Sequence, residues 1–482
     1  MVQLITNAPQ YANDIVEEIR LFLGLVEISP DTADAQLVLT VLLDEATRTA
    51  RGTAMPKGVS AQVSFEADGG DVLERKRQEK RGVKRVTYAL MQQVCPTEMP
   101  WGSLTGIRPT KLLRELSLRN GDAEAIRQFR ELFSVQEDKL RLAATICGVQ
   151  KPFIASVQPN DLDVYIGIPY CKSRCLYCSF GAELANPNAV EAYLVPLFSD
   201  ISRGAKLLHN GGWHLRALYI GGGTPTVLSA EQLDRLLCHV EATYGGYGQE
   251  CTVEAGRPDT ITREKLAVLK SHGVQRLSVN PQTMSDETLK RIGRLHTAAQ
   301  IFEAFSIARE MGFGSINMDL IAGLPGETES DMAHTLEAIS LMRPDNLTVH
   351  TLAIKRSSRL KEQLDRYPLP SRQAVERMID MGFQTARAMG LWPYYLYRQK
   401  YQNGNLENVG YSTPETVCLY NIDMMEETTS ILAHGAGAMT KRVFFGENRV
   451  ERVPNPKDVP TYANKLDVLD AQKRALFLGE KA

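Results

Sequence analysis

The chain has 482 residues, of which 43% are hydrophobic and 23% are charged, and its formal net charge is −2. This composition is typical of a globular protein, and the small charge argues against a general nucleic-acid or membrane-surface binder. No apolar run reaches the roughly 18 residues of a membrane-spanning helix, and the N-terminus lacks the pattern of a secretory signal. We therefore expect a cytoplasmic protein of roughly two to four domains, whose eight cysteines are reduced thiols or metal ligands.

Residues 1–150 are expected to form an N-terminal α+β domain. Residues 10–23 have helical periodicity, and Gly24 is a suitable end for that helix. The pattern of apolar residues predicts three strands, at 37–43, 60–65 and 85–90. The mixed-charge run at 74–81 favours the solvated face of a helix.

A loop rich in glycine and proline, residues 100–111, precedes helices that are predicted to run to about residue 148. The loop carries Trp101 and two cations, Arg108 and Lys111. These cations are suited to clamp an anionic group, but an ordinary helix entry with surface charges explains them equally well. A linker is expected at 150–161.

From residue 160 to about 390, strand patterns alternate with helix patterns. The strands are predicted at 163–169, 217–221, 251–255, 276–280, 315–321 and 346–352. The helices are predicted near 187–208, 229–243, 262–272, 285–310, 329–342 and 371–388. Six such units predict an α/β fold with a parallel sheet that forms a partial (β/α)6 barrel, whose active site lies at the C-terminal ends of the strands. A mixed C-terminal extension, residues 391–482, completes the chain.

Three closely spaced cysteines, Cys171, Cys175 and Cys178, follow the first of these strands on one loop. Thiolates grouped in this way bind a soft metal centre, either zinc or an iron–sulfur cluster. Three ligands on a four-iron cluster would leave one iron open, which is how a catalytic site keeps room for a substrate or cofactor. The alternative is a structural zinc site with a distant fourth ligand such as Cys238 or Cys251.

Polar residues, glycines and prolines also follow the other strands of the predicted barrel. The glycines at 221–223 would let a ligand approach the backbone, although a tight turn alone also explains them. Glu254 and Asp319 are either satisfied core carboxylates or groups that hold ribose hydroxyls, as a strand-end carboxylate does in nucleotide sites. His350 by itself is more typical of a structural residue. Because all these residues gather at one end of the strands, we expect the functional site there.

The C-terminal part is less regular. Residues 392–400 combine aromatic side chains with Arg398 and Lys400, a pattern that suits a flat ligand with several carboxylates but also an amphipathic strand at a sheet edge. Residues 403–408 are a polar turn, and residues 431–438 are a strand that enters a glycine turn.

Several of these phrases resemble a known family. The Cys-x3-Cys-x2-Cys spacing after Tyr-Ile-x-Ile-Pro-Tyr, together with Gly-Gly-Gly-Thr-Pro-Thr at 221–226, resembles the radical S-adenosylmethionine (SAM) superfamily. Residues 276–282 and 317–326 resemble its oxygen-independent coproporphyrinogen oxidase family. Residues 104–111 and 395–408 resemble the HemZ-type coproporphyrinogen dehydrogenases within that family. The resemblance covers nearly the whole chain.

The resemblance implies a [4Fe–4S] cluster on Cys171, Cys175 and Cys178, with SAM on the open iron. It implies that Tyr165 is catalytic and lies beside the cluster and SAM, and that Tyr177 packs in the cluster loop. The other residues implied to contact SAM, some of them through a second SAM molecule, are Gly222, Gly223, Thr224, Glu254, Gln282, Arg294, Asp319 and Ala353.

The implied reaction is the anaerobic oxidative decarboxylation of two propionates of coproporphyrinogen III to give protoporphyrinogen IX, a step of haem biosynthesis. A 5′-deoxyadenosyl radical made from SAM takes a hydrogen atom, and loss of CO2 and one electron leaves a vinyl group. A flavodoxin or ferredoxin is the expected electron donor. We take the propionate partners to be cationic side chains, namely Arg108, Lys111, Arg356, Arg398 and Lys400.

One position departs from the oxidases of this family, which carry a further cysteine where this chain has Phe180. Relatives with Phe at this position include haem chaperones that bind haem without oxidase activity. The alternatives are therefore a haem-binding chaperone and another radical SAM reaction on a tetrapyrrole, such as methyl transfer or ring opening.

Overall fold

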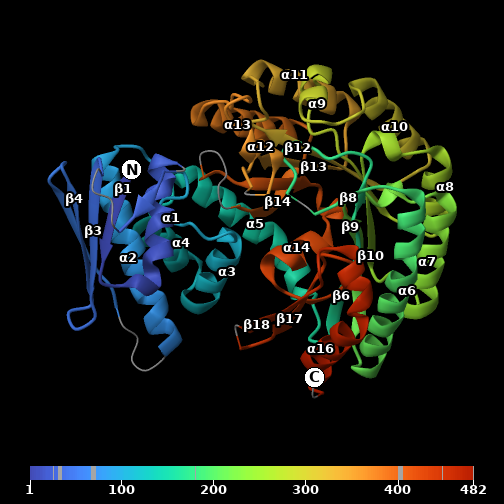
Figure 1. The fold of residues 1–482 in the computed structure, drawn as a ribbon, viewed down its shortest axis with the longest axis horizontal. Coiled ribbons are helices and arrows are strands. Elements are labelled where there is room, and N and C mark those ends of the chain that lie inside the picture. Colours follow the sequence, from blue (N-terminus) through green and yellow to red (C-terminus); the bar gives the residue numbers. More distant parts are fainter. Residues whose placement is uncertain are drawn as a thin grey trace. The chain divides into compact units, whose positions relative to one another are not determined.

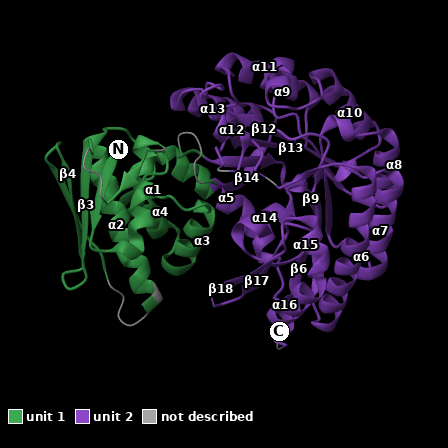
Figure 2. Cartoon of the chain, in the orientation of Figure 1, with its two compact units in different colours: residues 1–144, 398–400, 404–406 green, residues 145–397, 401–403, 407–482 purple. Residues whose placement is uncertain are grey.

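The computed structural model describes residues 1–24, 26–30, 35–66, 72–179, 181–355, 357–399, 405–447 and 449–480. The chain divides into two compact units, which Figure 2 colours separately. Unit 1 holds Met1–Ala144 with two short segments at Arg398 and Leu406, and unit 2 holds most of the rest. The three-part division at 1–150, 160–390 and 391–482 stays a prediction. Within the described residues, no helix combines the length and the hydrophobicity that crossing a membrane would require.

Unit 1 contains a five-stranded sheet in the order β2-β1-β3-β4-β5. Its strands are β1 (Val2–Thr6), β2 (Ile28–Ser29), β3 (Leu37–Asp44), β4 (Thr49–Met55) and β5 (Val59–Ser64). Two helices, α1 (Ala12–Leu23) and α2 (Val72–Val94), pack with it around one buried apolar core. The predicted helix at 10–23 and the predicted strands at 37–43 and 60–65 are confirmed.

The predicted strand at 85–90 is wrong, because these residues belong to α2. Val83, Val86 and Leu90 are fully buried and are spaced three and four residues apart, which places them on one face of a helix. The β-branched residues favour a strand locally, but the helical period of the longer segment decides the outcome. The charged run at 74–81 lies in the same helix, as expected.

Three helices follow in the chain, α3 (Pro109–Asn120), α4 (Asp122–Phe133) and α5 (Glu137–Ala155). The expected linker at 150–161 is therefore wrong in its first half, since α5 continues past Pro152 to Ala155. Proline is tolerated near a helix end when the carbonyls that it leaves without a partner can be satisfied elsewhere.

Unit 2 is built on parallel strands, as predicted. They are β6 (Asp161–Ile168), β9 (His214–Gly222), β10 (Glu250–Gly256), β11 (Arg276–Val279), β12 (Ser315–Ala322) and β13 (Asn346–Thr351), and they pair in this order. The connecting helices include α6 (Pro187–Asn210), α7 (Ala230–Tyr244), α8 (Arg263–Ser271), α11 (Glu329–Met342) and α13 (Arg372–Ala388). Figure 1 shows α6, α7 and α8 lying side by side along the outside of the strands. The predicted α/β fold class is confirmed.

The single helix expected at 285–310 is two helices, α9 (Asp286–Arg291) and α10 (Ala298–Glu310). Gly293, with a φ of 77°, turns the chain between them, and Thr297 begins α10 with a capping box. The break has a structural consequence, because the backbone carbonyls of Ile292 and Gly293 accept hydrogen bonds from the cysteine loop described below.

The C-terminal part extends both edges of this sheet. At one edge β15 (Asn408–Ser412) pairs antiparallel with β13, and β14 (Trp392–Tyr397) pairs with β15. At the other edge β16 (Ser430–His434) runs parallel to β6, followed by the antiparallel β17 (Met439–Phe444) and β18 (Arg449–Pro454). A seventh parallel strand thus flanks the first one, and the turn that follows it lies beside the cysteine loop's strand.

A buried ionic group fixes that turn. The Asp200 carboxylate on α6 accepts hydrogen bonds from Lys473 Nζ and Tyr462 Oη, both at 2.7 Å, and from the backbone N–H of Gly435 at 3.2 Å. Lys473 belongs to α16 (Leu466–Leu478), and His434 Nδ1 lies 3.0 Å from the same carboxylate. Burial raises the pKa of Asp200, but the Lys473 and His434 charges outweigh it and bring the pKa well below its ordinary value.

Candidate functional site

The three cysteines lie on the loop that leaves the C-terminal end of β6. The loop is tied to two other segments, because Leu176 N–H donates to Ile292 O at 2.8 Å and Leu360 N–H donates to Leu176 O at 2.9 Å. Ser173 Oγ also donates to Gly293 O at 2.8 Å. These bonds hold the loop against the turn between α9 and α10 and against the short helix α12 (Arg359–Glu362).

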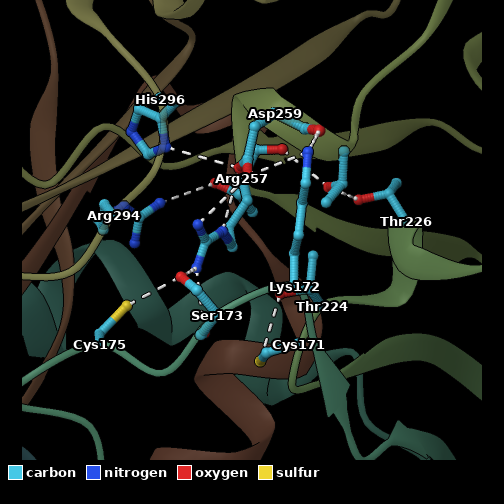
Figure 3. Close-up of polar contacts among 12 residues, drawn as sticks. Cys171, Lys172, Ser173, Cys175, Thr224, Thr226, Arg257, Asp259, Arg294 and His296 are labelled. Atoms are coloured by element: carbon cyan, nitrogen blue, oxygen red, sulfur yellow. Dashed lines mark hydrogen bonds and ion pairs between the residues drawn. The ribbon is translucent and has the colours of Figure 1, made fainter. Parts of the chain in front are cut away.

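A buried arginine, Arg257, follows β10 and contacts the cysteine loop directly (Figure 3). Its Nη1 donates to Ser173 Oγ at 2.8 Å and to Ser173 O at 3.2 Å, and lies 4.0 Å from Cys175 Sγ. Asp259 fixes the guanidinium by accepting from Nε at 3.1 Å. Sequence reasoning missed both residues as site residues, although they come directly after the strand end that carries Glu254.

Asp259 also contacts Lys172 and the imidazole of His296. Lys172 Nζ donates to the Asp259 backbone carbonyl at 3.0 Å, and His296 Nδ1 lies 3.7 Å from its carboxylate. Burial raises the pKa of Asp259, yet the interactions with His296, Arg257 and Lys172 lower it overall. The carboxylate therefore stays ionised and keeps Arg257 in position beside the cysteines.

The thiols themselves form a donor set that fits a soft metal centre. Burial raises the pKa of Cys171, although Thr224 Oγ1 donates to its sulfur at 3.5 Å. A buried thiol becomes a thiolate when a metal binds it, so the nearby Arg257 and the Thr224 hydroxyl supply the positive charge and the hydrogen bond that a thiolate cluster needs.

The other proposed zinc ligands do not share this loop. Cys251 is at the N-terminal end of β10, whereas the three cysteines follow the C-terminal end of the parallel β6, so they lie at opposite ends of the parallel strands. Cys238 lies on α7 and contacts His272 instead. Neither cysteine is therefore placed to complete a four-cysteine zinc site with this loop.

A pocket of about 270 Å³ adjoins the cysteine loop. It is bounded by residues immediately before and after the three cysteines, by the glycine turn, by Glu254 and by the segment after β16. The lining residues are Tyr165, Gly167, Ile168, Pro169, Ser179, Gly181, Ala182, Gly222, Gly223, Glu254, Ala436, Gly437, Ala438 and Lys457. The last four come from the C-terminal part, which sequence reasoning did not connect with this site.

The glycine turn forms one wall of the pocket. Gly222 has a φ of 108°, which side chains other than glycine rarely adopt. A Cβ on Gly223 would lie 2.4 Å from the carbonyl oxygen of Tyr170. Two adjacent positions thus require glycine, and the turn brings its backbone to the pocket surface next to the cysteine loop.

Glu254 is the carboxylate of this pocket. Tyr219 Oη donates to its Oε1 at 2.5 Å, and the Tyr219 ring stacks on Tyr420 at 4.5 Å between ring centroids and on Tyr165 at 6.2 Å. Burial, together with the Asp319 charge, raises the pKa of Glu254 to about 7, against the lowering effects of its hydrogen bonds. A partly buried carboxylate beside stacked tyrosine rings is suited to a ligand that carries positive charge and hydroxyl groups.

The remaining candidates form a second group at the ends of β11 and β12. Gln282 has a φ of 69°, and its backbone N–H donates to Asp319 O at 2.9 Å. Arg294 donates to Asn280 O at 2.6 Å and lies 3.4 Å from Tyr177 Oη, which joins this group to the cysteine loop. Gln282 Oε1 is buried and has no hydrogen-bond partner among the described residues, as expected for an acceptor that meets a ligand.

Asp319 and His350 interact within this group. Asn317 Nδ2 donates to Asp319 Oδ1 at 2.8 Å, and His350 Nε2 lies 3.7 Å from Oδ2. Burial raises the pKa of Asp319, but its interactions with His350 and Asn317 lower it overall. Ala353, two residues after β13, is partly buried.

Two of the cations predicted to bind propionates, Arg398 and Lys111, already have partners within unit 1. Arg398 donates to the backbone carbonyls of Leu104 and Asn405 and stacks over Trp101, so its donors already serve the fold of unit 1. Lys111 lies 3.7 Å from Glu115. Arg356 and Lys400 lie outside the described residues, as does Phe180.

Comparisons with known proteins found a matching family and several relatives. The profile of the Radical SAM superfamily matches residues 165–339. The chain is 35% identical over 464 residues to the oxygen-independent coproporphyrinogen-III oxidase-like protein HemZ of Bacillus subtilis, which covers 95% of this chain and 92% of that protein. It is 33% identical to the heme chaperone HemW of B. subtilis over 48% of this chain and 61% of that protein.

Two further comparisons concern Escherichia coli. The oxygen-independent coproporphyrinogen III oxidase is 32% identical over 42% of this chain and 44% of that protein. Among solved structures, the coproporphyrinogen III oxidase HemN is similar with a TM-score of 0.51 and 23% identity, over 67% of this chain and 73% of that one. This likeness shows that the two chains share a fold.

Proposed function

The chain belongs to the radical SAM family of oxygen-independent coproporphyrinogen-III oxidase-like proteins, and we propose that it converts coproporphyrinogen III to protoporphyrinogen IX without oxygen. One observation carries this proposal: the pocket that contains Glu254 is lined by residues that come just before and just after the three cysteines in the chain. Members of this superfamily use a [4Fe–4S] cluster and SAM. The proposal includes a cytoplasmic location and a flavodoxin or ferredoxin as electron donor.

The residues present fit both cofactors. Cys171, Cys175 and Cys178 would hold the cluster, and the glycine turn with Glu254 would hold SAM in the adjoining pocket. When bound, the cluster and SAM supply the one-electron chemistry that removes a hydrogen atom from an unactivated carbon. The protein's own residues do the rest: Arg257 keeps the loop in position, and Tyr165, which stacks on Tyr219, lines the pocket.

In the proposed reaction each propionate loses one hydrogen atom, one CO2 and one electron, and a vinyl group remains. Two such rounds on one tetrapyrrole give the divinyl product. Lys457, which lines the pocket from the C-terminal part, is the cation best placed to meet a propionate carboxylate there.

We expect Arg257 to tune the cluster as well as to position its loop. A cation 4.0 Å from Cys175 Sγ stabilises the reduced, more negative cluster. Arg257→Gln should make the reduction potential more negative by on the order of 100 mV, the effect of one nearby charge in a medium of intermediate dielectric. Arg257→Lys keeps the positive charge, so the reduction potential of this variant should stay close to that of the wild type. The measurement is a potentiometric titration followed by electron paramagnetic resonance.

Arg263→Gln is the matched control, because Arg263 is an exposed arginine on α8 whose partner is Glu310. An unchanged potential in Arg257→Gln, with normal iron content, would contradict a role for this charge. A loss of iron in both Arg257 variants would instead indicate that its main task is to hold the loop.

The proposed reaction is tested by an anaerobic assay. The cluster is reconstituted, and reductant, SAM and coproporphyrinogen III are added before the products are analysed by mass spectrometry. We expect protoporphyrinogen IX and two 5′-deoxyadenosine molecules for each product molecule. If 5′-deoxyadenosine forms without any vinyl product, the substrate assignment is wrong and the radical chemistry remains.

The second candidate function is haem binding, which the similarity to the HemW chaperones favours. The identity of residue 180 also favours this function, because Phe180 replaces the further cysteine of the oxidases. A stable complex of one haem per chain, without turnover of coproporphyrinogen III, would select this function over the oxidase.

A further inference from the structure

A cluster of three metal-ligating side chains lies on the outer helices of unit 2, apart from the cysteine loop. Asp234 and Cys238 are one helical turn apart on α7, so both side chains project from the same face. His272, the C-cap residue directly after α8, faces them with its ring nitrogen Nε2. The three ligand atoms all lie within 4.8 Å of one another.

The distances suit a single small cation. His272 Nε2 lies 2.8 Å from Asp234 Oδ1 and 3.9 Å from Cys238 Sγ. Two ligand atoms on a tetrahedral zinc stand roughly 3.2–3.8 Å apart, given bond lengths of about 2.0–2.3 Å. Asp234 and Cys238 are exposed, so small rotations of their side chains bring all three atoms to that separation.

The other nitrogen of the imidazole has a partner that could orient the ring when Nε2 binds a metal. Nδ1 lies 3.1 Å from Tyr247 Oη, and the Tyr247 hydroxyl can donate to Leu237 O at 3.1 Å. A metal on Nε2 would replace the proton that this nitrogen donates to Asp234. Nδ1–H would then donate to the Tyr247 hydroxyl, which in turn would donate to Leu237 O. A ligating histidine commonly has such a partner on its second nitrogen.

We propose that Asp234, Cys238 and His272 bind one zinc ion, with water as the fourth ligand. A thiolate, an imidazole and a carboxylate together favour zinc over magnesium or calcium, which prefer oxygen alone. Binding forms one bond to each side chain and releases the Cys238 proton to solvent. The ion would link α7 to the end of α8 and would act independently of the tetrapyrrole chemistry.

The test uses the full chain with its cluster already reconstituted, so that the cysteine loop is occupied. Zinc alone is added without oxygen, loosely bound metal is removed with a chelator, and the remaining zinc is counted. Zinc-edge X-ray absorption then gives the ligand shell. We expect one zinc per chain, surrounded by one sulfur and three nitrogen or oxygen atoms.

Variants locate the site. Cys238→Ser and His272→Gln should each weaken zinc binding by more than about 100-fold, and Tyr247→Phe by about 10-fold. Cys95→Ser, which removes a thiol elsewhere in the chain, should bind zinc like the wild type. If His272→Gln does not fold, Asp234→Asn, a change at an exposed side chain, replaces it as the second variant that tests zinc binding.

Three results would overturn the proposal. A shell with three sulfurs would place the zinc in the cysteine loop, and a shell without sulfur would show adventitious binding to surface carboxylates. Unchanged affinity in both Cys238→Ser and His272→Gln would show that Asp234 and His272 form a surface ion pair only. None of these results would bear on the coproporphyrinogen assay, so the two proposals fail separately.

Discussion

Cys175→Ala should lose nearly all its iron after reconstitution and should produce no 5′-deoxyadenosine above background. The loop offers three thiols, and the site is complete only when all three are present, because one iron position must stay open for SAM. Cys175 is the thiol beside Arg257, so its loss also leaves that buried cation without its sulfur neighbour. The expected change is from about four irons per chain to nearly none.

The control for this experiment is Cys95→Ala, since Cys95 lies in unit 1 after α2 and contacts Thr97. It should keep full iron content and the visible absorption of the cluster. Melting curves of both cluster-free proteins show whether the fold is intact. If Cys175→Ala retains its iron, the cluster is held by other thiols and the assignment of the loop is wrong.

Glu254→Gln is expected to weaken SAM binding by about 10- to 100-fold, the loss of one hydrogen bond to a charged group. Glutamine keeps the size of the side chain and can still accept the hydrogen bond from Tyr219 Oη. It lacks the negative charge that would meet the cationic part of SAM. Isothermal titration with SAM on the reconstituted protein measures the change.

The same substitution should stabilise the protein without SAM. The pKa of Glu254 is raised from 4.5 to about 7, so the folded protein binds this proton more tightly than the unfolded chain does. The carboxyl therefore costs nothing well below pH 4.5, and its cost grows as the pH rises to about 7. At pH 8, Glu254→Gln should raise the free energy of unfolding by up to about 3 kcal/mol, and at pH 5 by less than about 1 kcal/mol.

The affinity for SAM should also depend on pH through the ionisation of Glu254. The wild-type affinity should increase as the pH rises through 7, because the ionised carboxylate is the form that binds a cation. The affinity of Glu254→Gln should stay flat across that range. A parallel pH profile in the two proteins would show that Glu254 does not contact SAM.

Much of unit 2 could be predicted because parallel βα units leave a strong local pattern. Each strand is a short apolar run, each helix has its own period, and the strand ends are marked by glycine, proline and polar residues. The errors occurred where a longer pattern or a single turn decided the structure. Residues 85–90 joined the helix α2, and Gly293 divided the helix expected at 285–310.

The roles of the site residues remain predictions, but the structure shows which of these residues lie together. Tyr165, Gly222, Gly223 and Glu254 line one pocket beside the cysteines. Arg257 could have been suspected, since it directly follows the strand end of Glu254. Lys457 and the turn at 436–438 carry no local signal, because their place depends on β16 returning to pair with β6.

The sequence by itself determined the α/β class, the three-cysteine loop and the end of the parallel strands at which the site is expected. Those features follow from residue spacing, which acts over a few positions of the chain. Only the tertiary structure decided which distant segments complete the site: the C-terminal turn fixed by Asp200 and Lys473, and the Arg257–Asp259 pair against the cysteine loop. Such contacts depend on the packing of elements far apart in the chain, and a buried charge is stable only where that packing provides its partner.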